Sequence, residues 1–254
     1  MTEGEGPPLP PPFASSGRAP ERGPQPDRSQ ARGGPLHGGL RLPARGLLFD
    51  NDGVLVDSDA AVTASWSRWA TEQGLDPAGV MAVVHGRRSA DTVADLVPGA
   101  RRVAATALID RYELEDAGTV PAVAGAPDLL ASLPVEVWAV VTSGTPALAT
   151  ARLTAAGLPL PTAMVTGPDV RAGKPDPECY RLGARALGLR PEDTVVLEDS
   201  PAGVAAGRAA GARVVGIGER ALRAGADVVV RDLTGLRWAA GVLSVPAGAV
   251  LRAR

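Results

Sequence analysis

The sequence has little of three things: cysteine, net charge and long apolar runs. Its single cysteine, Cys179, excludes an intramolecular disulfide, which is typical of proteins from a reducing cytoplasm. The net charge of −2 argues against a protein that binds nucleic acid by electrostatic attraction. No uninterrupted apolar run is long enough to span a membrane. We therefore expect a cytoplasmic protein with neither a nucleic-acid nor a membrane partner.

Large apolar residues are scarce in the first 43 residues. This segment holds ten of the chain's 24 prolines, together with many glycine, serine and arginine residues. Such a composition cannot bury enough apolar surface to offset the conformational entropy that is lost on ordering. The segment also lacks the apolar stretch after a basic start that marks a signal peptide. We predict that residues 1–43 form a disordered extension.

From residue 44 onward, short apolar or β-branched runs alternate with helix-like segments. The predicted strands span residues 46–50, 135–142, 163–166, 194–199, 212–217 and 226–230. Continuous apolar strands that alternate with helices are typical of a parallel sheet covered on both faces. The sequence therefore predicts an α/β fold.

One stretch breaks this alternation. Between residues 58 and 125 we find helical patterns but no convincing strand, so the first strand is followed by a helical insertion. We assign residues 44–58 and 121–240 to the core, 59–120 to the insertion and 241–254 to a C-terminal tail. Trp66 and Trp69 lie three apart on one predicted helix face; we interpret them as the insertion's core, with the lining of a substrate cleft as the alternative.

Residues that a purely structural role does not explain stand at the ends of four segments. They are, in chain order, Asp50 and Asp52; Thr142, Ser143 and Gly144; Lys174; and Glu198 and Asp199. Parallel strands bind ligands at their carboxyl ends, which meet at one edge of the sheet. We therefore expect these side chains to lie together.

This combination of groups suggests a particular chemistry. Crowded carboxylates repel one another unless a cation lies between them, and a site of carboxylate oxygens and water suits Mg²⁺. Thr142 and the N–H groups of Ser143 and Gly144, ahead of a helix predicted to begin at Pro146, suit a phosphate. Lys174 adds a charge that can hold an anion or a carboxylate nucleophile. Together the groups predict phosphoryl transfer through an aspartyl-phosphate.

The two aspartates that follow the first strand take different roles in this scheme. Alternation along the strand aims Asp50 and Asp52 the same way and Asn51 elsewhere. Asp50 is the predicted nucleophile, and Asp52 is the predicted general acid and then general base. Gly53 lets the chain turn out of the strand.

The stretch Asp50-Asn51-Asp52-Gly53-Val54 resembles the D-x-D-G-[TV] signature of the haloacid dehalogenase-like hydrolase superfamily. Thr142 matches the Ser or Thr of the family's second motif, and Lys174 in "GKPDPE" matches its lysine. The acidic fourth motif is matched by "EDSPAGVAAGRAAG", which begins with Glu198 and Asp199. The four motifs occur in the family's order over roughly residues 46–236.

The resemblance implies a Rossmann-like core with a helical cap inserted after the first motif. It implies Mg²⁺ held by Asp50, by the backbone carbonyl of Asp52 and by Asp199, with Glu198 in or next to the ligand shell. It also implies that Asp50 attacks phosphorus, while Asp52 protonates the leaving oxygen and then activates water. Members that dehalogenate lack the second aspartate, so Asp52 favours the hydrolysis of a phosphate ester.

The cap loop "HGRRSADTV" and the strand end "VTSGT" look most like those of sugar-phosphate and glycerol-phosphate phosphatases. We therefore predict a small phosphorylated metabolite, a sugar or polyol phosphate, as substrate. In this interpretation Arg88 holds a phosphate or a hydroxyl, and His85 donates a hydrogen bond to the substrate. The alternative is that Arg87 and Arg88 are solvated surface charges and that His85 caps a turn.

Two other functions stay open. A β-phosphoglucomutase-like phosphosugar mutase shares the four motifs, but Thr145 and Pro146 stand where mutases usually carry a lysine or a similar donor, which favours hydrolysis. A catalytically silent binding module is the second alternative. Such proteins typically lose the nucleophile, the lysine or the acidic pair, and this sequence retains all of them. The sequence does not determine the oligomeric state, for which we favour a monomer.

Overall fold

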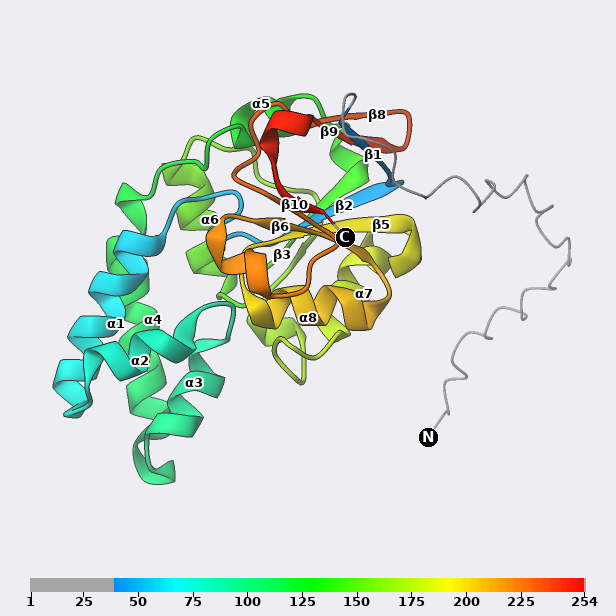
Figure 1. Ribbon diagram of the computed structural model, residues 1–254. Helices are drawn as coiled ribbons and strands as arrows, with labels where there is room; N and C mark the ends of the chain where they lie inside the picture. The colour runs from blue at the N-terminus through cyan, green and yellow to red at the C-terminus, as the bar shows by residue number, and fades with distance from the viewer. Residues whose placement is uncertain (1–38, 254) are drawn as a thin grey trace, which may run out of the picture. The chain divides into compact units, whose positions relative to one another are not determined.

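The structure is a computed structural model that describes residues 39–253. The helices are α1 Asp59–Gln73, α2 Pro77–Val84, α3 Ser89–Leu96, α4 Arg102–Glu115, α5 Ala126–Ala131, α6 Pro146–Ala155, α7 Glu178–Ala186 and α8 Pro201–Ala210 (Figure 1). The strands are β1 Leu40–Pro43, β2 Gly46–Phe49, β3 Trp138–Val141, β4 Met164–Val165, β5 Thr194–Glu198, β6 Arg213–Ile217, β7 Val228–Val230, β8 Arg237–Ala239, β9 Val242–Val245 and β10 Val250–Ala253. No helix in this part of the chain is long and apolar enough to cross a membrane.

The central sheet has seven strands in the order β10-β7-β6-β5-β2-β3-β4. All neighbours pair in parallel except β10, which runs antiparallel to β7. The strands β5, β2 and β3 are consecutive in the sheet, so their carboxyl ends lie side by side. The predicted α/β fold, with a mostly parallel sheet and a helical segment, is confirmed.

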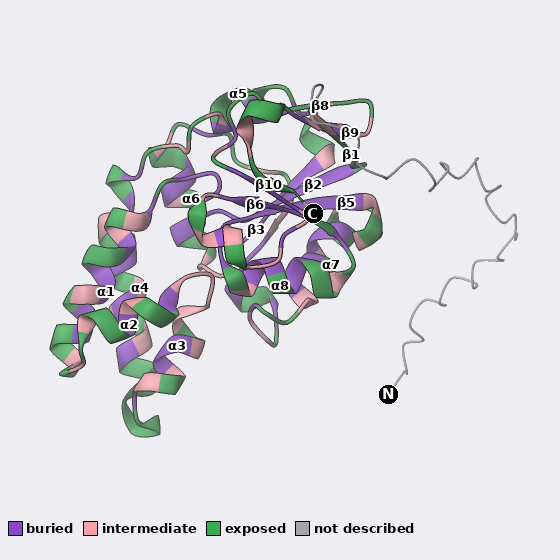
Figure 2. Ribbon diagram, in the orientation of Figure 1, coloured by how far each residue is buried: buried purple, intermediate pink, exposed green. Residues whose placement is uncertain are grey.

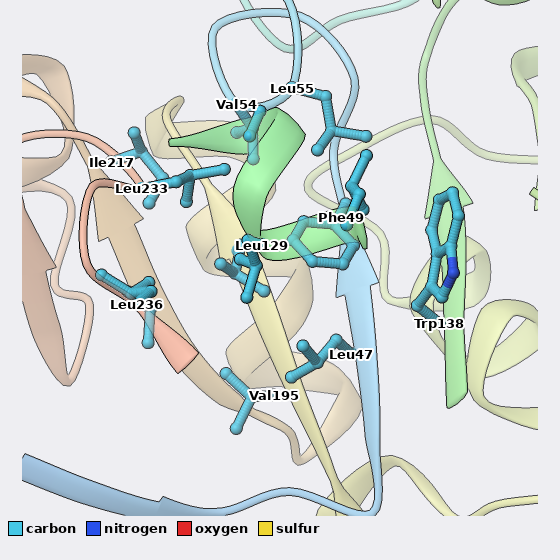
Figure 3. Packing of buried hydrophobic residues seen from close by; sticks show 14 of the residues in the cluster. Leu47, Phe49, Val54, Leu55, Leu129, Trp138, Val195, Ile217, Leu233 and Leu236 are labelled. Carbon is cyan, nitrogen blue, oxygen red and sulfur yellow. The ribbon is translucent and has the colours of Figure 1, made fainter. Parts of the chain in front are cut away.

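The apolar runs of the sequence bury both faces of this sheet, as Figure 2 shows for the central strands. In β2, Leu47 and Phe49 point to one face, where Phe49 lies edge-on to Trp138 at a centroid distance of 6.1 Å (Figure 3). Leu48 points to the opposite face and packs in a second cluster with Tyr180 of α7. Burial of one such large apolar side chain contributes about 2 kcal/mol to stability, which accounts for uninterrupted apolar strands.

Helices α1 to α4 lie between β2 and α5 in the chain and have a hydrophobic cluster of their own. Trp66 and Trp69 belong to this cluster, with ring centroids 5.3 Å apart. The indole N–H of Trp69 donates a hydrogen bond to the backbone oxygen of Ala105 at 2.8 Å, which ties α1 to α4. We call these four helices the cap.

Three segments differ from what the sequence predicted. Residues 1–38 of the predicted extension lie outside the described residues, but Leu40–Pro43 form β1, which pairs antiparallel with β9. The predicted C-terminal tail contains β9 and β10, and β10 extends the central sheet. These strands are too short to show a periodicity, and each depends on a distant partner. Val135–Val137 form a 3₁₀ turn rather than the start of a strand, because Pro134 precedes them.

Candidate active site

Asp50 lies directly after β2, at the edge where β5 and β3 also end. Its backbone N–H donates to Leu197 of β5 at 3.0 Å, and its carboxylate is almost fully buried. The chain then turns, because the backbone oxygen of Asn51 accepts hydrogen bonds from Leu55 and Val56. Gly53 has a φ of +75°, and a Cβ at this position would collide with the carboxylate of Asp199. The glycine therefore lets two acidic segments approach closely.

Lys174 fixes the carboxylate of Asp50 by a hydrogen bond. Its ammonium donates to Oδ1 of Asp50 at 2.7 Å, to Oε1 of Glu198 at 2.7 Å and to the backbone oxygen of Val141 at 3.1 Å. Burial works to lower the pKa of Lys174, but the two carboxylates raise it above its ordinary value. The lysine is therefore a fixed positive charge, and all three of its N–H bonds are used.

Glu198 contacts Lys174 and is fully buried. Its Oε1 accepts hydrogen bonds from Lys174 and, at 2.9 Å, from the hydroxyl of Tyr180. Its Oε2 accepts from the backbone N–H of Ser200 at 2.9 Å and from the Ser200 hydroxyl at 3.0 Å. Gly203 passes so close that a Cβ would collide with this carboxylate. With two donors on each oxygen, Glu198 is fixed in place and in turn positions Lys174.

Asp199 is oriented by an arginine that the sequence analysis missed. Its Oδ2 accepts hydrogen bonds from Arg220 at 2.7 and 3.2 Å, and the same guanidinium holds both oxygens of Asp59, the first residue of α1, at 2.8 Å. Arg220 follows β6 on a short 3₁₀ segment, Glu219–Arg223. Burial and the charge of Glu198 raise the pKa of Asp199 to about 7 in spite of Arg220.

The acidic groups at this edge fit a divalent cation. Asp50, Glu198 and Asp199 each offer an oxygen, and these oxygens lie within 4.8 Å of one another. Among residues 39–253, no donor reaches Oδ2 of Asp50 or Oδ1 of Asp199, and both residues line the cavity described below. Burial also raises the pKa of Asp50, although Lys174 opposes this. Two buried carboxylates with free oxygens favour a bound cation, and an all-oxygen set suits Mg²⁺.

Thr142, Ser143 and Gly144 follow β3 and reach the same edge. The N–H of Gly144 donates to Oγ1 of Thr142 at 3.0 Å, which shapes the turn. The hydroxyl of Ser143 donates to the backbone oxygen of Gly86 in the cap at 2.9 Å. Thr145 then caps α6, since its hydroxyl accepts a hydrogen bond from the N–H of Leu148 at 3.3 Å. This turn therefore faces the acidic residues and also docks the cap.

A cavity of about 70 Å³ lies between this edge and the cap. From the sequence prediction, its lining includes Asp50, Asp52, Thr142, Ser143, Gly144, His85 and Asp199. Further polar lining residues are Asp59, Arg87, Ser89, Asp110, Glu113, Arg152 and Arg220. Trp66 also lines the cavity, so it is both a core residue of the cap and a wall of the cleft. The structure thus brings most of the predicted site residues together.

Arg88 is the exception. The sequence analysis assigned it to substrate, but it does not line the cavity and its guanidinium is engaged elsewhere. It pairs with Asp91 at 2.6 and 2.7 Å and donates to the backbone oxygens of Val170 at 2.9 Å and Arg171 at 3.3 Å. The core loop that carries these oxygens leads to Lys174. Arg88 therefore docks the cap onto the core, whereas its neighbour Arg87, which pairs with Asp95 at 2.6 Å, lines the cavity.

His85 does lie in the cavity wall, close to Arg220 and Asp59. Burial and the positive charge of Arg220 lower its pKa, and Asp59 only partly opposes them. The imidazole is therefore neutral at pH 7, with one ring nitrogen able to donate and the other able to accept.

A second arginine, Arg152 on α6, was also missed, and this one is buried. It is 1% exposed, and its two terminal nitrogens contact Oδ1 of Asp52 at 2.7 Å and Oε1 of Glu113, from cap helix α4, at 3.4 Å. Burial raises the pKa of Glu113 to about 7, although Arg152 opposes this. One signal was available in the sequence: Arg152 is a charge on the stripe that Leu148 and Leu153 form on the buried side of α6.

Comparison with known proteins agrees with this geometry. The family model of the haloacid dehalogenase-like hydrolases matches residues 44–211. The chain belongs to the haloacid dehalogenase-like hydrolase family. Hexitol phosphatase A of Escherichia coli is 42% identical over 184 residues, which are 69% of this chain and 84% of that protein. Glycerol-1-phosphate phosphohydrolase 2 of Saccharomyces cerevisiae is 33% identical over 218 residues, or 78% of this chain and 86% of that one.

The fold is shared with solved structures. A hydrolase from Pseudomonas syringae superposes with a TM-score of 0.68 at 25% identity, over 74% of this chain and 94% of that chain. The family prediction is confirmed. The prediction of a hydrolase that acts on phosphoric monoesters is also confirmed, because both curated relatives are phosphatases and the match covers more than two thirds of the chain.

Proposed function

We propose that this family member is a Mg²⁺-dependent phosphatase that hydrolyses a sugar or polyol phosphate through an aspartyl-phosphate on Asp50. The arrangement of Asp50 carries the proposal. One of its oxygens is held by Lys174 at 2.7 Å, while the residue lines a cavity that Asp52, Thr142 and Asp199 also line. A carboxylate fixed in this way is a nucleophile whose second oxygen is free to attack.

Each residue has a defined part in the reaction. An oxygen of Asp50 attacks phosphorus, and the bond between phosphorus and the ester oxygen breaks. Asp52 gives its proton to the departing alkoxide, so that the alcohol leaves neutral. Asp52 then takes a proton from water, which attacks the phosphorus of the aspartyl-phosphate and returns Asp50 as a carboxylate. Lys174 balances the negative charge of the Asp50 carboxylate before the attack and again after the phosphoryl group has left as inorganic phosphate.

A cation and the turn after β3 would hold the phosphoryl group. Asp50, the backbone carbonyl of Asp52 and Asp199 would bind Mg²⁺, which neutralises charge on the phosphoryl oxygens. Thr142 and the turn through Gly144 line the cavity beside Asp50 and supply hydrogen-bond donors. Glu198 serves this site through Lys174.

The polar residues of the cap support a polyhydroxylated substrate. The cap contributes His85, Arg87, Ser89 and Asp110 to the cavity wall, and these side chains offer both donors and acceptors to hydroxyl groups. Related proteins act on compounds of this kind, as the names hexitol phosphatase and glycerol-1-phosphate phosphohydrolase state. A neutral His85 suits a substrate hydroxyl better than it suits a second phosphate.

A phosphosugar mutase is the second candidate. It would use the same Asp50 and Asp52, but it must keep the aspartyl-phosphate from being hydrolysed until the sugar phosphate has reoriented in the site. Thr145 caps α6 and Pro146 begins it, so neither supplies the cationic donor that a lysine would provide. We therefore favour hydrolysis. We also propose a monomer in the cytoplasm, in keeping with a buried, unpaired Cys179.

The test is a panel of hexitol, glycerol and hexose phosphates, assayed for inorganic phosphate and, by phosphorus NMR, for isomerised esters. We expect Mg²⁺-dependent phosphate release from polyol or sugar phosphates, lost when EDTA removes the metal. Conversion of one hexose phosphate isomer into another without phosphate release would establish the mutase instead. A folded protein inactive toward every ester would contradict both.

A further inference from the structure

Arg152 is a charged side chain that the reaction above does not use. It comes from α6 of the core and is 1% exposed, so its charge is removed from water. A buried guanidinium is tolerated only where carboxylates compensate it. Its two partners are Asp52 at 2.7 Å and Glu113 of the cap at 3.4 Å. The shorter contact is to the residue with the proton-transfer role.

The contact leaves Asp52 with one free oxygen. Arg152 occupies Oδ1. Oδ2 receives only the long 3.4 Å hydrogen bond from the side-chain amide of Asn51. A carboxyl group that protonates a leaving oxygen and then deprotonates water needs one of its oxygens to face the phosphorus in both steps. A guanidinium bound to Oδ1 leaves Oδ2 as the oxygen for both steps.

The guanidinium is itself placed for the carboxylates rather than for its own hydrogen bonding. Its Nε is buried and has no partner among the described residues, so the side chain leaves one donor unpaired while both terminal nitrogens face carboxylates. A buried donor without a partner is destabilising, and a purely structural arginine has no reason to incur that loss. The position of Arg152 is therefore determined by Asp52 and Glu113.

We infer that Arg152 is a positioning residue for proton transfer: it holds Oδ1 of Asp52 so that Oδ2 faces the reacting oxygen, and Glu113 accepts a hydrogen bond from the other terminal nitrogen of the guanidinium. This inference rests on the proposed function, because it assigns Asp52 the acid and base roles. It concerns a side chain 100 residues from Asp52 in the sequence and outside the four motifs.

The test separates the two proton transfers by the leaving group. An alkoxide from a polyol phosphate needs a proton in order to leave, whereas p-nitrophenolate does not. In both cases Asp52 must still activate water afterwards. In Arg152→Met, we expect kcat for glycerol phosphate to fall by roughly 100-fold, the lower end of general acid-base effects. With p-nitrophenyl phosphate, we expect a burst of one nitrophenolate per enzyme, followed by slow turnover as the aspartyl-phosphate accumulates.

Glu113→Gln is the matched control. The glutamine amide oxygen can still accept a hydrogen bond from Arg152, so Asp52 stays oriented although the buried charge is removed. We expect no burst in this variant. A burst in Glu113→Gln as large as in Arg152→Met would overturn the inference, because the effect would then follow the charge balance of the cluster. Equal slowing of both esters in Arg152→Met, with no burst, would overturn it as well.

The remaining outcomes are also decisive. If Arg152→Met does not fold, as judged by circular dichroism, Arg152→Lys keeps the charge on a single terminal nitrogen, which cannot reach Asp52 and Glu113 as the two nitrogens of the guanidinium do. We expect the same burst with a smaller loss on glycerol phosphate. Uniform loss on both esters in Arg152→Lys would count against the inference. Wild-type enzyme that turns over neither ester in Mg²⁺ would instead overturn the proposed function, and this inference with it.

Discussion

The ammonium of Lys174 lies 2.7 Å from Oδ1 of Asp50, and both side chains are almost fully buried. The same ammonium lies 2.7 Å from Glu198, which is fully buried as well. One lysine therefore compensates two carboxylates in a low-dielectric environment. Removing one partner of such a cluster leaves charge buried and uncompensated, which is more costly than the cluster's own net contribution.

Lys174→Met should therefore abolish phosphate release and lower the free energy of unfolding by about 3–5 kcal/mol. Urea unfolding and a phosphate assay measure the two effects. Tyr180→Phe is the control, since it removes only the 2.9 Å hydrogen bond to Glu198 and leaves the ammonium in place. We expect it to lose about 2 kcal/mol and to stay active. A Lys174→Met protein as stable as the wild type would contradict this account of the cluster.

Gly53→Ala tests the close approach of the two acidic segments. Gly53 and Gly157 both have positive φ, +75° and +67°, so alanine is strained at either position by about 1–2 kcal/mol. Only at Gly53 would the new methyl group collide with Asp199, whereas the space beside Gly157 is open. Gly53→Ala should thus lose activity more than 10-fold, and Gly157→Ala should retain it despite a similar loss of backbone stability. Equal activity in the two variants would contradict the proposed role of Asp199.

The two neighbouring arginines of the cap loop give a matched pair. Arg88 contacts core carbonyls and lies outside the cavity, so Arg88→Ala should weaken cap docking and lower kcat/KM equally for a polyol phosphate and a small artificial ester. Arg87 lines the cavity. Arg87→Ala should raise KM for the polyol phosphate more than for the small ester. The reverse pattern would return Arg88 to the substrate-binding role that the sequence suggested.

The site residues that could be predicted from the sequence are those that stand at the ends of the predicted strands. Asp50, Thr142 and Asp199 each come directly after a strand, and the parallel sheet places those ends side by side. The arginines could not be found in this way. Arg152 and Arg220 meet Asp52 and Asp59 across 100 and 161 residues of sequence, and only the tertiary fold brings these partners together.

The short strands were missed for a related reason. Val242–Val245 and Val250–Ala253 have four residues each, too few to distinguish a strand from a loop by alternation. Their pairing with β1 and β7 is decided by tertiary contacts that no local pattern contains.

Glu113 gives the stability of the protein a specific pH dependence. Burial raises its pKa from 4.5 to about 7. The folded state therefore binds a proton that the unfolded state has released, and the favourable contribution present below pH 4.5 is lost as pH rises to about 7. The wild type should lose about 3 kcal/mol relative to Glu113→Gln over this range. Urea unfolding of both proteins at several pH values measures the difference, and a difference that does not change with pH would contradict the burial of this carboxylate.

Asp50→Asn tests the central claim most directly. Asparagine has nearly the same shape, so the variant should keep the fold, as judged by circular dichroism, while the nucleophile is lost. The measurement is inorganic phosphate release from a polyol phosphate in Mg²⁺, with the wild type and the wild type in EDTA beside it. We predict phosphate release by the wild type in Mg²⁺, and none by Asp50→Asn or by the wild type in EDTA. Release by Asp50→Asn at the wild-type rate would show that phosphoryl transfer does not pass through Asp50.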